Sequence, residues 1–285
     1  MKNLTMVMHC PDQKGIIANV TNFIHENKGN IIYIDQYVDR VHAIFFMRIE
    51  VDFKGHLSFS LDQFRGDFNK SVGTRFALNC DFFDPKIPPK MAVFVSKHDH
   101  CIYDVLSQHH AGKLAVKIPF IVSNHPDLKH IAQRFEIPFY HIPVTAATKK
   151  EAEREQLKLL EAYQIDFIVL ARYMQIISPE LIAHFPNKII NIHHSFLPAF
   201  PGAKPYHSAY NRGVKIIGAT SHYVTEELDA GPIIEQDIAR VSHLHQLQDF
   251  IEIGQDLERL VLLRALKQHT QRKVMVYNNK TIVFI

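Results

Sequence analysis

The sequence lacks the short motifs by which several large enzyme classes are recognised. It contains no Gly-x-Gly-x-x-Gly, no Gly-x4-Gly-Lys-Ser/Thr, no Cys-x-x-Cys, no His-Glu-x-x-His and no Gly-x-Ser-x-Gly. These absences argue against dinucleotide chemistry, P-loop hydrolysis, the common zinc sites and the serine-hydrolase nucleophile elbow. We therefore expect neither a cofactor nor a metal ion. The segments His98-Asp99-His100-Cys101 and His243-x-His245 carry candidate metal ligands, but neither brings a complete set.

Other scarcities bear on location and partners. No run of about 18 apolar residues is present, so no membrane-spanning helix is predicted. The first residues show no long apolar region and no small-residue cleavage site, so we expect no secretory signal. The three cysteines, Cys10, Cys80 and Cys101, are scattered and do not form a disulfide framework, which predicts a reducing, cytoplasmic location. A net charge of +3 over 285 residues is too small and too evenly spread to predict a nucleic-acid partner.

The first eighty residues alternate strand-like apolar runs with segments of helical spacing. We expect strands at 4–9, 31–39, 42–51 and 75–81, and helices at 16–26 and 61–69. The order βαββαβ is the ferredoxin-like pattern, so residues 1–82 are predicted to form a small α+β domain. Residues 83–90 carry three prolines, which favour an extended linker.

From Met91 onward, strands and helices alternate. We expect strands at 91–96, 116–123, 139–142, 167–171, 188–192 and 215–224, helices at 101–109, 128–135, 149–163, 179–184 and 248–268, and a closing hairpin over 274–284. This alternation predicts an α/β domain over residues 91–285, with a mostly parallel sheet covered on both faces.

Three polar residues stand where a strand pattern gives way to a loop: Asn191, His193 and Asp229. In α/β folds, ligands bind at the carboxyl ends of strands. Asn191 and His193 are two residues apart, so on a strand their side chains share a face. An amide that stabilises an oxyanion and an imidazole that moves a proton suit chemistry on a carbonyl group. Alone, however, Asn-x-His is a common tripeptide, and an Asp before Gly-Pro is often only a turn residue.

The whole constellation is more specific. Asn-Ile-His-His-Ser-Phe-Leu-Pro begins at Asn191, and Leu-Asp-Ala-Gly-Pro-Ile-Ile spans 228–234. Together these segments resemble the signature of the formyltetrahydrofolate-dependent formyltransferase fold. The variant here, with Pro-Tyr-His at 205–207 and Gly-Ala-Thr at 218–220, is similar to the formyltetrahydrofolate deformylases over essentially the full chain.

The resemblance implies hydrolysis of 10-formyltetrahydrofolate to tetrahydrofolate and formate, which supplies formate for purine synthesis and balances one-carbon folate pools. Asn191 would stabilise the oxyanion, while His193 and Asp229 would handle protons; which group takes the first proton stays open. The resemblance also implies substrate-binding residues: Arg172, Tyr173, Met174, Gln175, Ile176, His194, Lys204, His222, Val224 and Thr225. Many relatives carry Arg at position 175, so a contact to the glutamate tail is left for Arg172 or Lys204.

Two other functions remain open. The glycinamide ribonucleotide formyltransferases of this fold hold the acceptor phosphate in a Gly-rich turn after their first strand. Here that segment, 95–100, reads Val-Ser-Lys-His-Asp-His, without Gly, which favours water as the nucleophile. Formyl transfer to an amine such as glycinamide ribonucleotide remains the alternative, and a non-catalytic folate-binding sensor is the third.

The first domain also resembles a known module. Its βαββαβ order with Pro-Asp-x-x-Gly-Ile at 11–16 resembles the ACT domain, a small amino-acid-sensing module. The resemblance implies an amino-acid effector, glycine or methionine, and a homo-oligomer, dimer or tetramer. The effector-contacting residues would be Asp12, Gly15, Ile16, Asn30 and Ile31. The alternative is that this segment only turns the chain and starts a helix.

Overall fold

The computed structural model describes residues 3–54, 60–199 and 205–284. The chain divides into two compact units, one over 1–87 with 271–275 and 282–285, the other over 88–270 with 276–281. The division between residues 87 and 88 falls inside the proline-bearing segment 83–90. Two short C-terminal segments are thus assigned to the first unit. The periodicity of the sequence gives no indication of this assignment.

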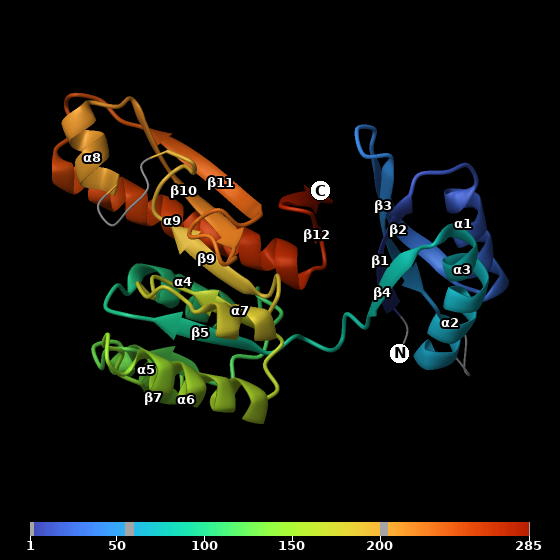
Figure 1. Ribbon diagram of the computed structural model, residues 1–285, viewed down its shortest axis with the longest axis horizontal. Coiled ribbons are helices and arrows are strands. Elements are labelled where there is room, and N and C mark those ends of the chain that lie inside the picture. The colour runs from blue at the N-terminus through green and yellow to red at the C-terminus, as the bar shows by residue number, and fades with distance from the viewer. Residues whose placement is uncertain (1–2, 55–59, 200–204, 285) are drawn as a thin grey trace. The chain divides into compact units, whose positions relative to one another are not determined.

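The first unit is a four-stranded antiparallel sheet with helices (Figure 1). Its elements are β1 (Asn3–Pro11), α1 (Ile16–Glu26), β2 (Asn30–Asp39), β3 (Ile44–Asp52), α2 (Leu61–Phe68), the π-helical turn η1 (Asn69–Gly73), α3 (Thr74–Phe76) and β4 (Asn79–Phe83). The sheet order is β2-β3-β1-β4. The ferredoxin-like prediction is therefore confirmed. Helix α1 buries Ile16, Val20 and Ile24, whose spacing places them on one face.

The predicted strand at 75–81 is wrong in its position. Helical turns continue from α2 through η1 and α3 to Phe76, and Ala77, at φ 50°, ends them. Phe68 and Phe76 are buried along this run, so packing extends the helical segment into residues with strand-like propensity. Strand β4 begins only at Asn79.

The second unit contains a seven-stranded sheet of order β11-β10-β9-β8-β5-β6-β7. Its strands are β5 (Met91–Val95), β6 (Ile121–Ser123), β7 (Phe139–His141), β8 (Phe167–Leu170), β9 (Ile189–His193), β10 (Ile216–Tyr223) and β11 (Ile233–Arg240). Strands β5 to β9 are parallel, and β10 and β11 run antiparallel to their neighbours. The predicted mostly parallel sheet is confirmed.

Helices surround this sheet. They are α4 (His100–His110), α5 (Lys129–Arg134), α6 (Lys149–Ala162), α7 (Pro179–His184), α8 (Pro205–Arg212) and α9 (Leu247–Thr270). Helices α5 and α6 lie at the β7 end of the sheet, and α8 and α9 lie at the β10–β11 end (Figure 1). A hairpin of β12 (Val274–Tyr277) and β13 (Lys280–Val283) follows α9. Within the described ranges, no helix is both long enough and apolar enough to cross a membrane.

Two strands differ from the prediction. Strand β6 covers only the last part of the predicted range 116–123, because Lys117 makes a single isolated bridge with Lys90. Strand β11 was not predicted, since it carries charged residues and forms a partly exposed edge of the sheet. Its antiparallel pairing with β10 nevertheless fixes the position of the loop between them, which carries Asp229.

Candidate active site

Strand β9 supplies the amide and one imidazole of the site. It lies between β8 and β10, and its residues Asn191 and His193 pair with His222 and Thr220 of β10. Because the two side chains are separated by one residue on an extended strand, both project from the same face of the sheet. His193 is only 5% exposed, so its ring is held away from bulk solvent.

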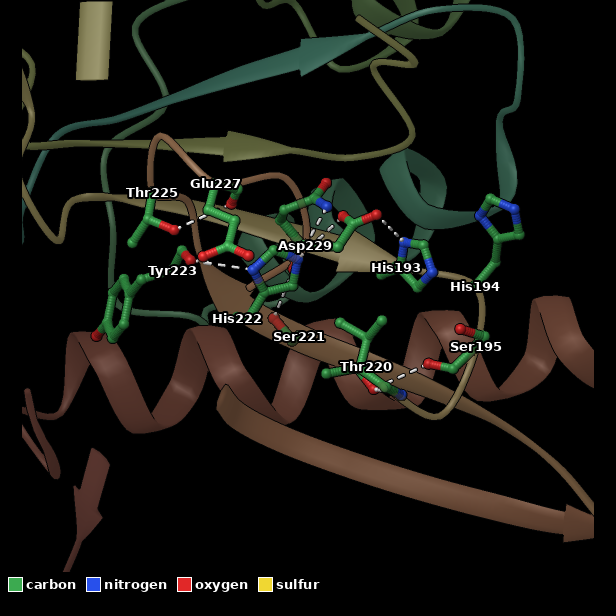
Figure 2. Close-up of polar contacts among 12 residues, drawn as sticks. His193, His194, Ser195, Thr220, Ser221, His222, Tyr223, Thr225, Glu227 and Asp229 are labelled. Atoms are coloured by element: carbon green, nitrogen blue, oxygen red, sulfur yellow. Dashed lines mark hydrogen bonds and ion pairs between the residues drawn. The ribbon is translucent and has the colours of Figure 1, made fainter. Parts of the chain in front are cut away.

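The loop after β10 supplies the carboxylate. The Asp229 Oδ2 lies 3.3 Å from His193 Nδ1, and its Oδ1 lies 3.6 Å from His222 Nε2. Figure 2 shows this carboxylate between the two imidazole rings. Asp229 has a φ of 55°, a left-handed conformation that Asp adopts more readily than most residues.

Gly231 makes this loop path possible. The Tyr223 N–H donates to the Pro232 carbonyl at 2.9 Å, which draws the loop back across the end of β10. A Cβ at position 231 would lie 1.8 Å from the Tyr223 carbonyl oxygen. Only glycine permits so close an approach, so the Asp-Ala-Gly-Pro sequence fixes where Asp229 can stand.

A β-bulge orients His222. The pairing of β10 with β11 shifts between Ser221 and His222, so the regular ladder is interrupted at this residue. Bulges often redirect a side chain beside an active site. The His222 ring is 2% exposed, and its Nδ1 donates to the Tyr223 carbonyl at 3.0 Å. Its Nε2 consequently faces Asn191 and Asp229.

The protonation of the site follows from these contacts. Burial opposes the charge on Asp229, but the hydrogen bond from His193 and the nearby His222 ring prevail and hold the pKa of this carboxyl below its usual range. Asp229 is therefore ionised at neutral pH. It accepts the His193 Nδ1–H, which leaves Nε2 as the reactive nitrogen. The buried Nε2 of His193 has no hydrogen-bond partner among the described residues.

Asn191 keeps a hydrogen-bond donor for a ligand. Its Nδ2 lies 3.2 Å from His222 Nε2. A side-chain amide carries two N–H groups, so one of them remains to bind an oxygen atom. The site thus combines an amide donor, an imidazole with an open nitrogen and an ionised carboxylate.

A cleft opens beside these groups. Its lining residues come from the ends of β8, β9 and β10 and from the two loops that follow β8 and β10: Leu170, Gln175, Ile176, Ile177, Asn191, His222, Val224, Thr225, Glu226, Leu228 and Asp229. Five of the predicted substrate-binding residues, Gln175, Ile176, His222, Val224 and Thr225, are among them. Leu170, Ile177, Glu226 and Leu228 were not predicted, although they adjoin the predicted segments.

Comparisons with known proteins show the family of the chain. Residues 89–266 match the family model described as formyl transferase, and residues 5–58 match the ACT domain model. A formyltetrahydrofolate deformylase of Synechocystis is 48% identical over all of both chains. The chain belongs to the formyltetrahydrofolate deformylase family. The crystal structure of a deformylase from Pseudomonas syringae has a TM-score of 0.96 at 43% identity, covering 100% of this chain and 95% of that one.

A transformylase structure matches less of this deformylase-family chain. The glycinamide ribonucleotide transformylase 1 from Symbiobacterium toebii has a TM-score of 0.67 at 25% identity and covers 73% of this chain and 98% of that one. In this family member, the segment after β5 carries Ser96, whose hydroxyl contacts the Asn124 side chain at 2.5 Å and also donates to the Tyr173 carbonyl. The Ser96 side chain is thus engaged in hydrogen bonds within the protein.

Of the remaining predicted substrate-binding residues, Arg172, Tyr173, Met174 and His194 are not part of the cleft lining. The Tyr173 ring packs against Phe94, and its hydroxyl accepts a hydrogen bond from Gln156 at 2.8 Å, so this side chain belongs to the core. Met174 is 48% exposed. Lys204 lies outside the described residues.

Arg172 and His194 belong to a buried polar cluster on the other side of His193. The Glu258 carboxylate of α9, fully buried, lies 3.5 Å from Arg172 Nε. It accepts hydrogen bonds from His100 Nε2 at 2.8 Å and from the Tyr206 hydroxyl at 2.6 Å. No motif in the sequence marked Glu258. Its spacing did contain a signal, because Glu258 occupies the same helix face as the buried Gly254, Leu257, Val261 and Leu262.

Three atoms that could bind a metal ion gather in this cluster. The ligand atoms of His100, Cys101 and Glu258 lie within 4.8 Å of one another. However, Arg172 places a fixed positive charge beside Glu258, and both carboxylate oxygens already accept hydrogen bonds. Burial raises the pKa of the Cys101 thiol well above its ordinary value, which opposes the thiolate that a metal requires. The group fits a hydrogen-bonded ion cluster better than a metal site.

The predicted effector residues separate into two groups in the first unit. Asp12 follows β1 and donates its backbone N–H to the Ala43 carbonyl at 2.7 Å, and Gly15, at φ 93°, begins α1 beside the buried Ile16. Asn30 opens β2 and pairs with Asp52 at the far end of β3, followed by Ile31. One copy of this module therefore does not bring the two groups together.

Proposed function

We propose that this chain hydrolyses 10-formyltetrahydrofolate to tetrahydrofolate and formate. The observation that carries the proposal is the grouping of Asn191, His193 and Asp229, of which Asn191 and Asp229 line the cleft, in a chain whose full-length relatives are named formyltetrahydrofolate deformylases. Water is the acceptor, and neither a cofactor nor a metal ion takes part. The reaction breaks the bond between N10 and the formyl carbon and forms a new C–O bond.

Asn191 stabilises the charge that develops on the formyl oxygen. As water adds to the formyl carbon, the carbonyl oxygen becomes an oxyanion, and the free N–H of Asn191 donates to it. One such donor contributes a factor of about 10²–10³ in rate. Because the other N–H is held by His222, the amide is oriented before the substrate arrives.

His193 and Asp229 move the protons. His193 Nε2 accepts a proton from the attacking water, and the imidazolium that forms is stabilised by the ionised Asp229 at Nδ1. The same Nε2–H then donates to N10, so that tetrahydrofolate leaves as a neutral amine. The tetrahedral intermediate collapses to formic acid, which carries one oxygen from the formyl group and one from water and loses its remaining proton to solvent to become formate.

The cleft is the proposed pteridine site. The segment 175–177 lies on one side of it and the loop 224–229 on the other. Arg172, whose guanidinium is engaged with Glu258 and His194, is poorly placed to bind the glutamate tail. That contact is left to Lys204.

The proposal extends to cellular context. Hydrolysis of this substrate would release formate for purine synthesis and balance one-carbon folate pools. A cytoplasmic location fits three free cysteine thiols. A homo-oligomer, dimer or tetramer, is supported by the edge strand β2, which exposes Ile32, Ile34 and Tyr37. Glycine or methionine is the proposed effector, and its two groups of contact residues would meet only if two modules pair.

The test is formate release from 10-formyltetrahydrofolate without an amine, repeated with glycinamide ribonucleotide. We expect the same rate of formate release in both, with Asn191→Ala and His193→Ala losing turnover while remaining folded. Asp237→Asn, which alters a surface carboxylate paired with Arg264, should keep wild-type activity. Formylated ribonucleotide without formate would instead establish the transferase function, and folate binding without turnover would establish a sensor.

A further inference from the structure

The buried cluster beside His193 contains charged residues that the stability of the fold does not require. We define the Glu258 cluster as Arg172, Glu258, His100 and Tyr206. Glu258 is fully buried and Arg172 is 9% exposed, yet both are charged. A buried ion pair seldom stabilises a protein more than apolar residues of the same volume would. Charged groups buried beside an active site are therefore candidates for a functional role.

The surrounding helix is adapted to this cluster. Gly254 lies in the middle of α9, where glycine is unfavourable compared with alanine. A Cβ at this position would lie 2.1 Å from the Tyr206 ring. The glycine thus leaves room for Tyr206, whose hydroxyl reaches Glu258. Burial and the adjoining Glu258 charge both raise the pKa of Tyr206 far above its ordinary value, so the phenol remains a donor.

Arg172 connects the cluster to His194. Its Nη1 forms a hydrogen bond with His194 Nδ1. A guanidinium only donates, so Nδ1 is the acceptor and the proton of His194 sits on Nε2. An imidazolium carries an N–H on both nitrogens and could not accept at Nδ1. His194 is therefore held as one neutral tautomer in one orientation.

His194 in turn lies against His193. The two rings are nearly parallel, with centroids 5.1 Å apart and planes inclined by 21°. A fixed ring on one side and Asp229 on the other leave His193 little freedom to rotate. The direction of its Nε2 is thereby fixed.

We propose that Arg172 and Glu258 are positioning residues for the reaction, acting through His194 on His193. Glu258 holds the Arg172 guanidinium in place and balances its charge. Arg172 holds the neutral His194 ring in one orientation. The His194 ring packs against His193 and keeps that ring in place while it takes up a proton. Because the charges of Arg172 and Glu258 cancel, His193 can become an imidazolium without facing the unpaired charge of Arg172. This inference rests on the proposed hydrolysis, in which His193 moves the proton.

The test separates turnover from binding. In Glu258→Gln the shape persists, but Arg172 keeps an uncompensated charge, so kcat should fall about 10- to 100-fold. Because no residue of the Glu258 cluster lines the cleft, KM and the affinity for tetrahydrofolate should change less than about two-fold. Glu252→Gln, on the exposed side of the same helix, is the matched control and should leave kcat unchanged.

A double-mutant cycle distinguishes positioning through His194 from a general structural effect. His194→Ala should lower kcat by a similar factor, and adding Glu258→Gln to it should lower kcat little further. His194→Gln, which keeps a donor near the place of Nε2, should recover part of the loss. If Glu258→Gln does not fold, Tyr206→Phe can be used instead, because it removes only one hydrogen bond to the carboxylate. This variant should show a smaller fall in kcat, again with little change in KM.

The results have separate consequences. A wild-type protein that releases no formate would overturn the proposed function itself. Wild-type hydrolysis with an unchanged kcat in Glu258→Gln, or in Tyr206→Phe where the first variant is unfolded, would overturn only the positioning role. Additive losses in the double variant, or losses carried by KM rather than kcat, would likewise exclude the path through His194.

Discussion

Replacing Asp229 by Asn should reduce turnover severely while preserving the shape of the site. The carboxylate lies 3.3 Å from His193 Nδ1, and at an effective dielectric constant near 20 this pair is worth about 5 kcal/mol once the imidazole is charged. Asn retains a neutral acceptor worth about 1 kcal/mol. A net loss of roughly 3–4 kcal/mol from the transition state corresponds to a kcat lower by about 10²–10³.

The assay is steady-state formate release by Asp229→Asn, with thermal unfolding measured in parallel. The control is Asp237→Asn, which removes the charge of a partly exposed carboxylate 2.8 Å from Arg264 and should keep wild-type kcat. Retention of more than about a third of wild-type kcat by Asp229→Asn would refute a charge-stabilised His193 imidazolium. Equal losses in both variants would show a general effect of charge.

Three further outcomes follow from the same geometry. Because the folded-state pKa of Asp229 is depressed, its stabilisation is present above the unfolded value of about 4 and is lost as pH falls below it. The unfolding free energies of wild type and Asp229→Asn should therefore converge in acid, as denaturant titrations can show. Gly231→Ala would place a Cβ 1.8 Å from the Tyr223 carbonyl, so kcat should fall at least about ten-fold; wild-type kcat would contradict the loop path. Gly254→Ala should destabilise by about 1–3 kcal/mol through its clash with Tyr206; a raised melting temperature would contradict this packing.

Much of the fold could be predicted, because its core strands carry strong apolar signals. β5 and β8 are buried along their whole length, and the surface helix α6 shows clear amphipathic spacing. Prediction failed where pairing or packing with other elements outweighs the secondary-structure preference of the local sequence. The edge strand β11 lacks a regular alternation of buried apolar and exposed polar residues and is defined by its pairing with β10. The start of β4 depends on how far packing extends the helical run before it.

The candidate site divides in the same way. Asn191, His193 and Asp229 could be singled out because a motif and a strand-end pattern mark them. The contact between Asp229 and His222 could not be predicted, since it depends on a bulge and on the close approach at Gly231. Glu258 was missed because an acidic residue on an amphipathic helix usually faces solvent. Only the packing of α4, α8 and α9 brings it to Arg172.

The most direct test of the central claim uses 10-formyltetrahydrofolate in water enriched with oxygen-18, without an amine, during a single turnover. If water attacks the formyl carbon, each formate released carries one labelled oxygen and one unlabelled oxygen. Mass spectrometry of the formate, corrected by a blank without enzyme, measures this. Singly labelled formate in amounts equal to tetrahydrofolate is the predicted result. Release of tetrahydrofolate without labelled formate would contradict hydrolysis at this site.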